Sequence, residues 1–270
     1  MASVTERHIS RTRRHSAQSF SIDPARQRYT YLSQRPLHVL VFLLPLIAVF
    51  EIGAASAHST KTILARKVLS EFFDWFGAGG LHVPAILTIV VLIIWHILSA
   101  DRWRIRGRVL IGMVFESAAW TAPLLVLGLI LSRVLGIGPA SAPPAAMALV
   151  GVTDASTMPA WFTSLSMALG AGVYEEVLFR FVGIALVHIA VVDVGGLSDF
   201  WGKAIGVVAT AALFAGYHNI APLGHIDWGL AVFYFAAGVY FGVVYLARGL
   251  GIVVGVHALY DVVVLMQPLQ

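Results

Sequence analysis

The sequence predicts an all-α protein, a polytopic transmembrane helix bundle of about seven spans plus one interfacial amphipathic helix. Two observations carry this prediction. Hydrophobic residues make up 59% of the 270 residues and charged residues only 12%, whereas soluble domains carry about 25% charged residues. The mean hydropathy is +0.83, and the apolar residues gather in segments of about 20, the length that crosses a bilayer as a helix.

Residues 1–36 form a polar arm that we expect to be a disordered, basic, cytoplasmic tail. The arm is rich in arginine and serine and has no apolar stretch of its own, so it is not a secretory signal peptide. An organellar transit peptide is the alternative, because such peptides are also rich in arginine and serine and poor in acidic residues.

Seven apolar segments follow the tail, and each is expected to form one span. They are residues 37–57, 82–99, 109–132, 161–190, 200–220, 228–247 and 251–266. Between the first two, residues 59–76 interleave charged and apolar side chains, which predicts an amphipathic helix on the membrane surface with Trp75 as its anchor. This helix and the first three spans form a front half, residues 37–134.

A loop rich in glycine and proline, residues 135–160, separates the front half from a four-helix unit, residues 161–270. Four arginines follow the second span, at positions 102, 104, 106 and 108. Two crossings bring this cluster to the side of the basic tail, so the positive-inside rule places both in the cytoplasm. We therefore expect an integral protein of a bacterial cell membrane, in contact with the lipid bilayer.

The same charge pattern argues against nucleic acid as a partner, because the basic residues flank apolar spans. The oligomeric state stays open. The chain has no cysteine, which excludes disulfides, thiolate metal sites and a cysteine nucleophile.

Two adjacent carboxylates and an arginine lie inside the fourth apolar segment. Glu176 and Arg180 are four residues apart and share a helix face, which predicts an ion pair, while Glu175 is turned about 100° away. Ionisable groups at this depth are costly and commonly face a functional interior. A purely structural pair is the expected role of Glu176 and Arg180, whereas Glu175 has no partner in its own segment.

Two further polar pairs follow at helical spacing in the same unit. His218 lies one turn beyond Phe214, and His257 is four residues before Asp261. A single histidine in a membrane helix is often only hydrogen-bonded to a neighbouring helix, the role expected for His96 and His188. Because the glutamate–arginine group and both histidine pairs occur in one unit, a functional site is favoured over three unrelated structural contacts.

Together these motifs resemble the CAAX prenyl protease and bacteriocin-processing family of intramembrane proteases (CPBP, or Abi). The family pattern is Glu-Glu-x-x-x-Arg, then Phe-x-x-x-His, then His-x-x-x-Asn or Asp, and the sequence matches it in this order. The resemblance covers the back unit only. It implies an endopeptidase acting on a membrane-associated peptide or protein substrate, such as a CAAX-type tail or a leader peptide.

The resemblance also implies residue roles. Glu175 would act with His218 on the attacking water, and His257 with Asp261 would stabilise the oxyanion. The last motif more commonly ends in Asn, so Asp261 must be protonated to donate, or else it orients His257 or binds an ion. The family is often classed as metalloendopeptidases and zinc is possible, but no metal is assigned.

Two other classes of function remain open. Buried charges and histidines also form ion or proton pathways in transporters, and a catalytically inactive member would act as a scaffold or immunity protein. The expected depths also disagree: at 1.5 Å per residue, Glu175 and His218 lie about 22 and 27 Å from the cytoplasmic ends of their spans, but His257 only about 9 Å. Either the turn at 248–251 enters the bundle, or the span boundaries differ.

Overall fold

The computed structural model describes residues 28–56, 82–135, 158–218, 220 and 225–265. All regular structure in these ranges is helical. Five helices are long and apolar enough to cross a membrane, and two shorter apolar helices, Val83–Leu98 and Leu250–Val264, accompany them. The predicted all-α bundle of about seven spans is therefore confirmed, and the chain is an integral membrane protein.

The helices follow the predicted segments closely. The front half contains α3 (Pro36–Ser56), α5 (Val83–Leu98) and α6 (Gly107–Leu135), and the back unit ends with α9 (Asp199–Tyr217), α10 (Trp228–Arg248) and α11 (Leu250–Leu265). The predicted interfacial helix at 59–76 and most of the loop at 135–160 lie outside the described residues.

The fourth span is one continuous helical column with an unexpected internal geometry. It begins as α7 (Ala160–Glu175), widens into the π-helix η3 (Glu176–Gly183), returns to α8 (Ile184–His188) and ends as a second π-helix, η4 (Ile189–Val194). The sequence predicts a single helix ending at residue 190. Long π-helical stretches are rare and often mark functional sites, and the first of these begins at the glutamate pair.

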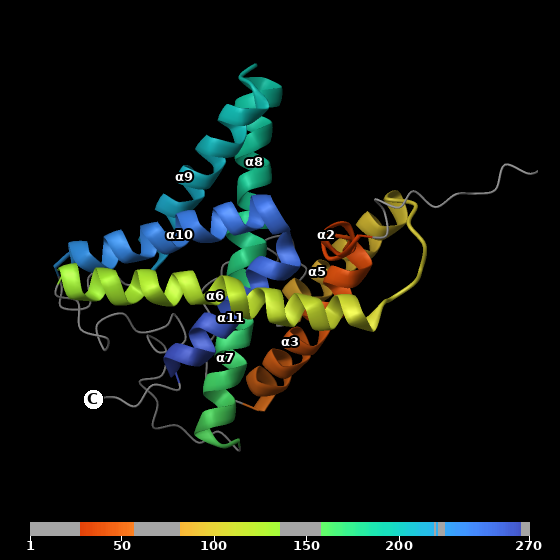
Figure 1. Ribbon diagram of the computed structural model, residues 1–270, viewed down its shortest axis with the longest axis horizontal. Helices are drawn as coiled ribbons and strands as arrows, with labels where there is room; N and C mark the ends of the chain where they lie inside the picture. The colour runs from red at the N-terminus through yellow and green to blue at the C-terminus, as the bar shows by residue number, and fades with distance from the viewer. Residues whose placement is uncertain (1–27, 57–81, 136–157, 219, 221–224, 266–270) are drawn as a thin grey trace, which may run out of the picture.

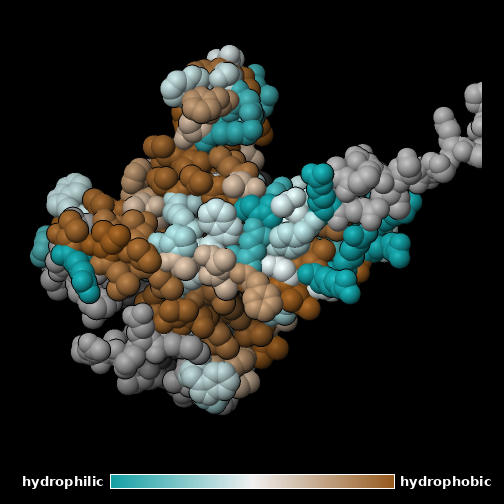
Figure 2. Space-filling view, viewed as in Figure 1, coloured by the Kyte–Doolittle hydropathy of each residue, from teal (hydrophilic) through white to brown (hydrophobic). Residues whose placement is uncertain are grey.

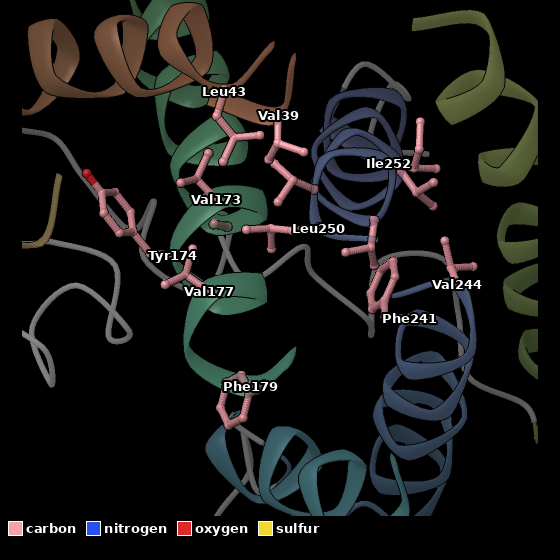
Figure 3. Packing of buried hydrophobic residues seen from close by; sticks show 14 of the residues in the cluster. Val39, Leu43, Val173, Tyr174, Val177, Phe179, Phe241, Val244, Leu250 and Ile252 are labelled. Atoms are coloured by element: carbon pink, nitrogen blue, oxygen red, sulfur yellow. The ribbon is translucent and has the colours of Figure 1, made fainter. Parts of the chain in front are cut away.

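The column forms the centre of the molecule. In Figure 1 it runs vertically, α6 and α10 cross it side by side, and α9 slopes along its upper part. Helix α11 packs against both α7 and α6, and α3 packs against α7 and α11. Figure 3 shows Val39 and Leu43 of α3, Val173 of α7 and Leu250 of α11 meeting in the core between these helices.

A sharp turn joins α10 and α11. Gly249 has φ +80°, a backbone conformation that favours glycine, and α11 starts at the next residue. Leu250, Ile252 and Val256 are at most 3% exposed, so α11 begins among buried residues, as expected if the turn at 248–251 enters the bundle. The boundary of the fourth span also differs from the prediction, because its helical column continues to Val194.

Paired glycines allow α10 to approach α9 closely. A Cβ atom on Gly238 would lie 2.9 Å from the Cα of Ala211, and one on Gly242 would lie 2.9 Å from the side chain of Val207. Larger residues at these two positions would push α9 and α10 apart.

The outer surface suits a lipid environment. Large apolar side chains of α6 are widely exposed, among them Ile111, Phe115 and Leu129, the last two at 72% and 60%. Figure 2 shows apolar surface over most of this face, with hydrophilic residues gathered at the tip of α8 and α9 and near the start of α6.

Two expectations need correction. His96 is 1% exposed and neither ring nitrogen has a hydrogen-bond partner among the described residues; it packs edge-on against Trp103 instead. His188 does bond to a neighbouring helix, with Nε2 2.9 Å from Asp199 Oδ1 of α9.

The second correction concerns the expected tail. Part of it is helical, because α2 (Tyr29–Leu32) precedes α3 and contacts α6.

Candidate active site

The polar residues singled out from the sequence meet at one place in the back unit. Glu175 and Glu176 lie where α7 passes into η3, His218 lies directly after α9, and His257 and Asp261 lie on α11. All five are at most 8% exposed. Three segments far apart in the sequence thus bring two imidazoles and three carboxyl groups into one buried cluster.

Glu175 is at the centre of this cluster. Its Oε2 atom is 3.8 Å from His218 Nε2 and 3.9 Å from His257 Nε2, too far for direct hydrogen bonds. Neither carboxylate oxygen has a hydrogen-bond partner among the described residues. A buried carboxylate is normally satisfied, so Glu175 is exceptional among the described residues and is the first candidate for a functional group.

The backbone determines which nitrogen of His218 faces Glu175. His218 is the C-cap of α9, with an extended backbone at ψ 154°, and its Nδ1 lies 2.7 Å from the carbonyl oxygen of Phe214. A carbonyl oxygen only accepts, so Nδ1 carries a hydrogen and, in the neutral ring, Nε2 presents its lone pair. That lone pair is on the side of Glu175, where it can accept from a shared water.

Glu176 has two partners. Its Oε1 lies 3.1 Å from Arg180 Nη1, which confirms the predicted ion pair, and it also accepts a hydrogen bond from His257 Nδ1 at 2.7 Å. The second contact was not expected from the sequence. It links the glutamate motif to the last helix, so Glu176 holds the ring of His257 as well as balancing the charge of Arg180.

Arg180 is fully buried in an aromatic cage. Its guanidinium carbon lies 4.4 Å from the ring centre of Phe214 and 5.1 Å from that of Phe241. Nη2 donates to the carbonyl oxygen of Gly238 at 3.2 Å. These contacts partly replace the water that a buried cation loses, and they attach η3 to α10.

Asp261 lies beside His257 without fixing its orientation. Its Oδ2 is 3.7 Å from His257 Nε2 and has no hydrogen-bond partner in the described part of the chain. Since Glu176 already binds Nδ1 of the same ring, the orienting role that the sequence left open for Asp261 falls to Glu176. Both carboxylates thus approach Nε2 of His257, Glu175 at 3.9 Å and Asp261 at 3.7 Å.

Comparison with known families agrees with this geometry. Residues 157–263 match the family model of Rce1-like type II CAAX prenyl endopeptidases. This segment is similar to the Rce1-like family. The match spans the whole cluster and agrees with the family recognised from the three motifs, and at family level it supports a CAAX-type intramembrane endopeptidase. No curated protein and no solved structure matches the chain.

The Rce1-like unit contains two site residues that the sequence motifs did not indicate. Tyr234 stacks on His218 with ring centres 4.0 Å apart, and Phe241 stacks on His257 at 4.6 Å. Both rings come from α10, seven residues apart and therefore on one face, with Gly238 between them. The sequence signal for these two residues was their spacing around a glycine. Aromatic residues at helical spacing usually belong to the hydrophobic core, so this signal alone does not indicate a site.

The described residues contain no preformed metal site, since no group of three histidine, aspartate or glutamate side chains within them is close enough together to hold an ion. The Nδ1 atoms of His218 and His257 are engaged by the Phe214 carbonyl and by Glu176, and the Nε2 atoms of both rings face Glu175.

Proposed function

We propose that this protein hydrolyses a peptide bond of a membrane-associated substrate, with water activated by Glu175 and His218. The observation that carries the proposal is the position of Glu175. It is a fully buried carboxylate without a hydrogen-bond partner in the described residues, and it lies between two imidazole nitrogens at 3.8 and 3.9 Å. A water between Glu175 and His218 can hydrogen-bond to both.

The reaction then follows from the positions of these groups. The water oxygen attacks the carbonyl carbon of the substrate while its proton passes to Glu175. The oxyanion develops on the side of His257 and Asp261, where Nε2–H of a His257 imidazolium or a protonated Asp261 carboxyl can donate to it. Glu175 returns the proton to the leaving nitrogen as the C–N bond breaks, which yields a carboxylic acid and an amine.

The fixed geometry supports this sequence of steps. His218 is held by the Phe214 carbonyl and the ring of Tyr234, while His257 is held by Glu176 and the ring of Phe241. Catalytic groups whose partners already fix them need little reorganisation during the reaction. A CAAX-type tail is the substrate that the family match favours, and a leader peptide is the second choice.

The test uses purified full-length protein in lipid vesicles and three peptides: a farnesylated CAAX peptide, the same peptide without the lipid, and a hydrophobic leader peptide. Mass spectrometry of the products should show one cleaved bond in the farnesylated peptide with wild-type protein and none with Glu175→Gln. Cleavage should persist with 1,10-phenanthroline. If the wild type leaves all three peptides intact, or if Glu175→Gln cleaves them equally well, the proposal is wrong.

A further inference from the structure

A second network of polar groups lies at the turn between α10 and α11, outside the candidate active site. Arg248, the last residue of α10, donates from both Nε and Nη2 to the two carboxylate oxygens of Glu116 on α6, with Nη2 2.9 Å from Oε2. Trp120 Nε1 donates to Oε1 of the same carboxylate at 3.3 Å. A two-point contact between guanidinium and carboxylate fixes direction as well as distance.

The segment before the first span completes this network. The Tyr29 hydroxyl donates to Oε2 of Glu116 at 2.5 Å, and Ser33 Oγ accepts from Nη2 of Arg248 at 3.3 Å. Burial, together with the neighbouring carboxylate, raises the pKa of Tyr29 above its usual range, so the hydroxyl remains a donor at neutral pH. The segment therefore touches both partners of the ion pair.

Two glycines allow the segment to fit against the helices. A Cβ atom on Gly112 of α6 would lie 2.6 Å from the ring of Tyr29, and one on Gly249 would lie 3.3 Å from the side chain of Gln34. Gln34 also donates to the carbonyl oxygen of Ala247 at 3.3 Å. The segment is thus in contact with the last turn of α10 and with the residue that reverses the chain.

The network lies at the start of the helix that carries two residues of the candidate active site. His257 lies seven residues after Leu250, about 10 Å along α11 at 1.5 Å per residue, and every residue from 250 to 256 is apolar or glycine. Apolar packing is not directional, and the directional contacts of this stretch are two hydrogen bonds from α6, Ser117 Oγ to the Ile252 carbonyl at 3.4 Å and Thr121 Oγ1 to the Val256 carbonyl at 3.3 Å. The charged contacts of Arg248 add a fixed point at the turn from which α11 starts.

We infer that Tyr29, Ser33, Gln34 and Glu116 form a positioning clamp, which holds the turn between α10 and α11 so that His257 and Asp261 face Glu175. The inference rests on the proposed function for its effect on catalysis, but not for its effect on the helix. Tyr29, Glu116 and Arg248 are positioning residues, because they act on the site through α11.

The test compares Tyr29→Phe with Tyr31→Phe, both in vesicle-reconstituted full-length protein. The first substitution removes one hydroxyl from the clamp, and the second is a matched control, because the ring of Tyr31 lies against Arg35 instead. Hydrogen exchange should become at least threefold faster at the backbone amides of residues 250–258 in Tyr29→Phe and stay unchanged in Tyr31→Phe. This measurement requires no substrate.

Kinetics on the farnesylated CAAX peptide provide the second measurement. We expect Tyr29→Phe to lower kcat about three- to tenfold with KM within twofold of wild type, since a small misplacement of a catalytic group slows chemistry more than binding. Arg248→Lys, which keeps the charge but loses the two-point contact, should lower kcat further at a similar melting temperature.

The outcomes separate this inference from the proposed function. Unchanged exchange at residues 250–258 in Tyr29→Phe overturns the clamp, whatever the activity. If the wild type is active and Tyr29→Phe shows faster exchange but an unchanged kcat, the catalytic role of the clamp is wrong. If the wild type cleaves nothing, the proposed function fails, and faster exchange in Tyr29→Phe alone still supports the clamp on α11.

Discussion

The adjacent glutamates Glu175 and Glu176 should respond in opposite ways to the same substitution. Glu175→Gln removes a buried negative charge that has no hydrogen-bond partner in the described residues, so the folded protein loses no bond and avoids the cost of a buried carboxylate. Its melting temperature should equal or exceed that of the wild type. Its activity should fall about 10²–10⁴-fold, the range for loss of a general base.

Glu176→Gln should mainly lower stability. It leaves the buried guanidinium of Arg180 without its counter-charge, and breaking one side of a buried pair costs about 3–5 kcal/mol. The lower end applies, because Arg180 keeps its aromatic contacts and its hydrogen bond to Gly238. About 3 kcal/mol corresponds to a fall of roughly 6–12 °C in melting temperature for a chain of this size.

Some activity should survive in this second variant. The amide oxygen of a glutamine can still accept from His257 Nδ1, as Glu176 does at 2.7 Å, so the rate should fall about tenfold or less, the equivalent of one weakened hydrogen bond. Thermal unfolding in detergent and peptide cleavage in vesicles measure the two effects separately. Equal melting temperatures together with equal residual activities would refute the division of roles.

Three further predictions concern other parts of the molecule. Asp261→Asn should retain activity and extend it to higher pH, because an amide donates at any pH, whereas Asp261→Ala should lose about 10²–10³ in rate; an Asn variant as inactive as the Ala variant would remove the donor role. Cysteines introduced at positions 20 and 104 should both be labelled from the cytoplasmic side, and labelling from opposite sides would contradict the span map. The raised pKa of Tyr29 means that its contribution to stability is complete below its unfolded pKa of about 10 and is lost as the pH rises towards the folded value. Thermal unfolding between pH 9 and 11 should therefore show a smaller alkaline loss for Tyr29→Phe than for wild type, and identical profiles would contradict this assignment.

The sequence predicted the spans well because hydropathy and helix length are local properties. The predicted segments 109–132 and 228–247 correspond to helices Gly107–Leu135 and Trp228–Arg248. Motif spacing also predicted the Glu176–Arg180 pair, because residues four apart share a helix face. These conclusions depend only on neighbouring residues in the chain.

The parts that could not be predicted depend on contacts between distant segments. No local pattern shows that His257 Nδ1 binds Glu176, or that Tyr234 stacks on His218, since each contact joins two helices far apart in sequence. The depth of His257 stayed open, because no local pattern shows that α11 begins among buried residues. The π-helix from Glu176 was also missed, because its residues are ordinary helix formers.

The balance of formal charge in the cluster has a consequence for product release. Three acidic side chains, Glu175, Glu176 and Asp261, lie there with a single guanidinium, that of Arg180. Hydrolysis of a peptide bond creates one more carboxylate in the same buried space, where like charges repel strongly. Under the proposed function we therefore expect the acidic fragment to leave readily, so that peptide acids are poor inhibitors and turnover does not wait for their departure.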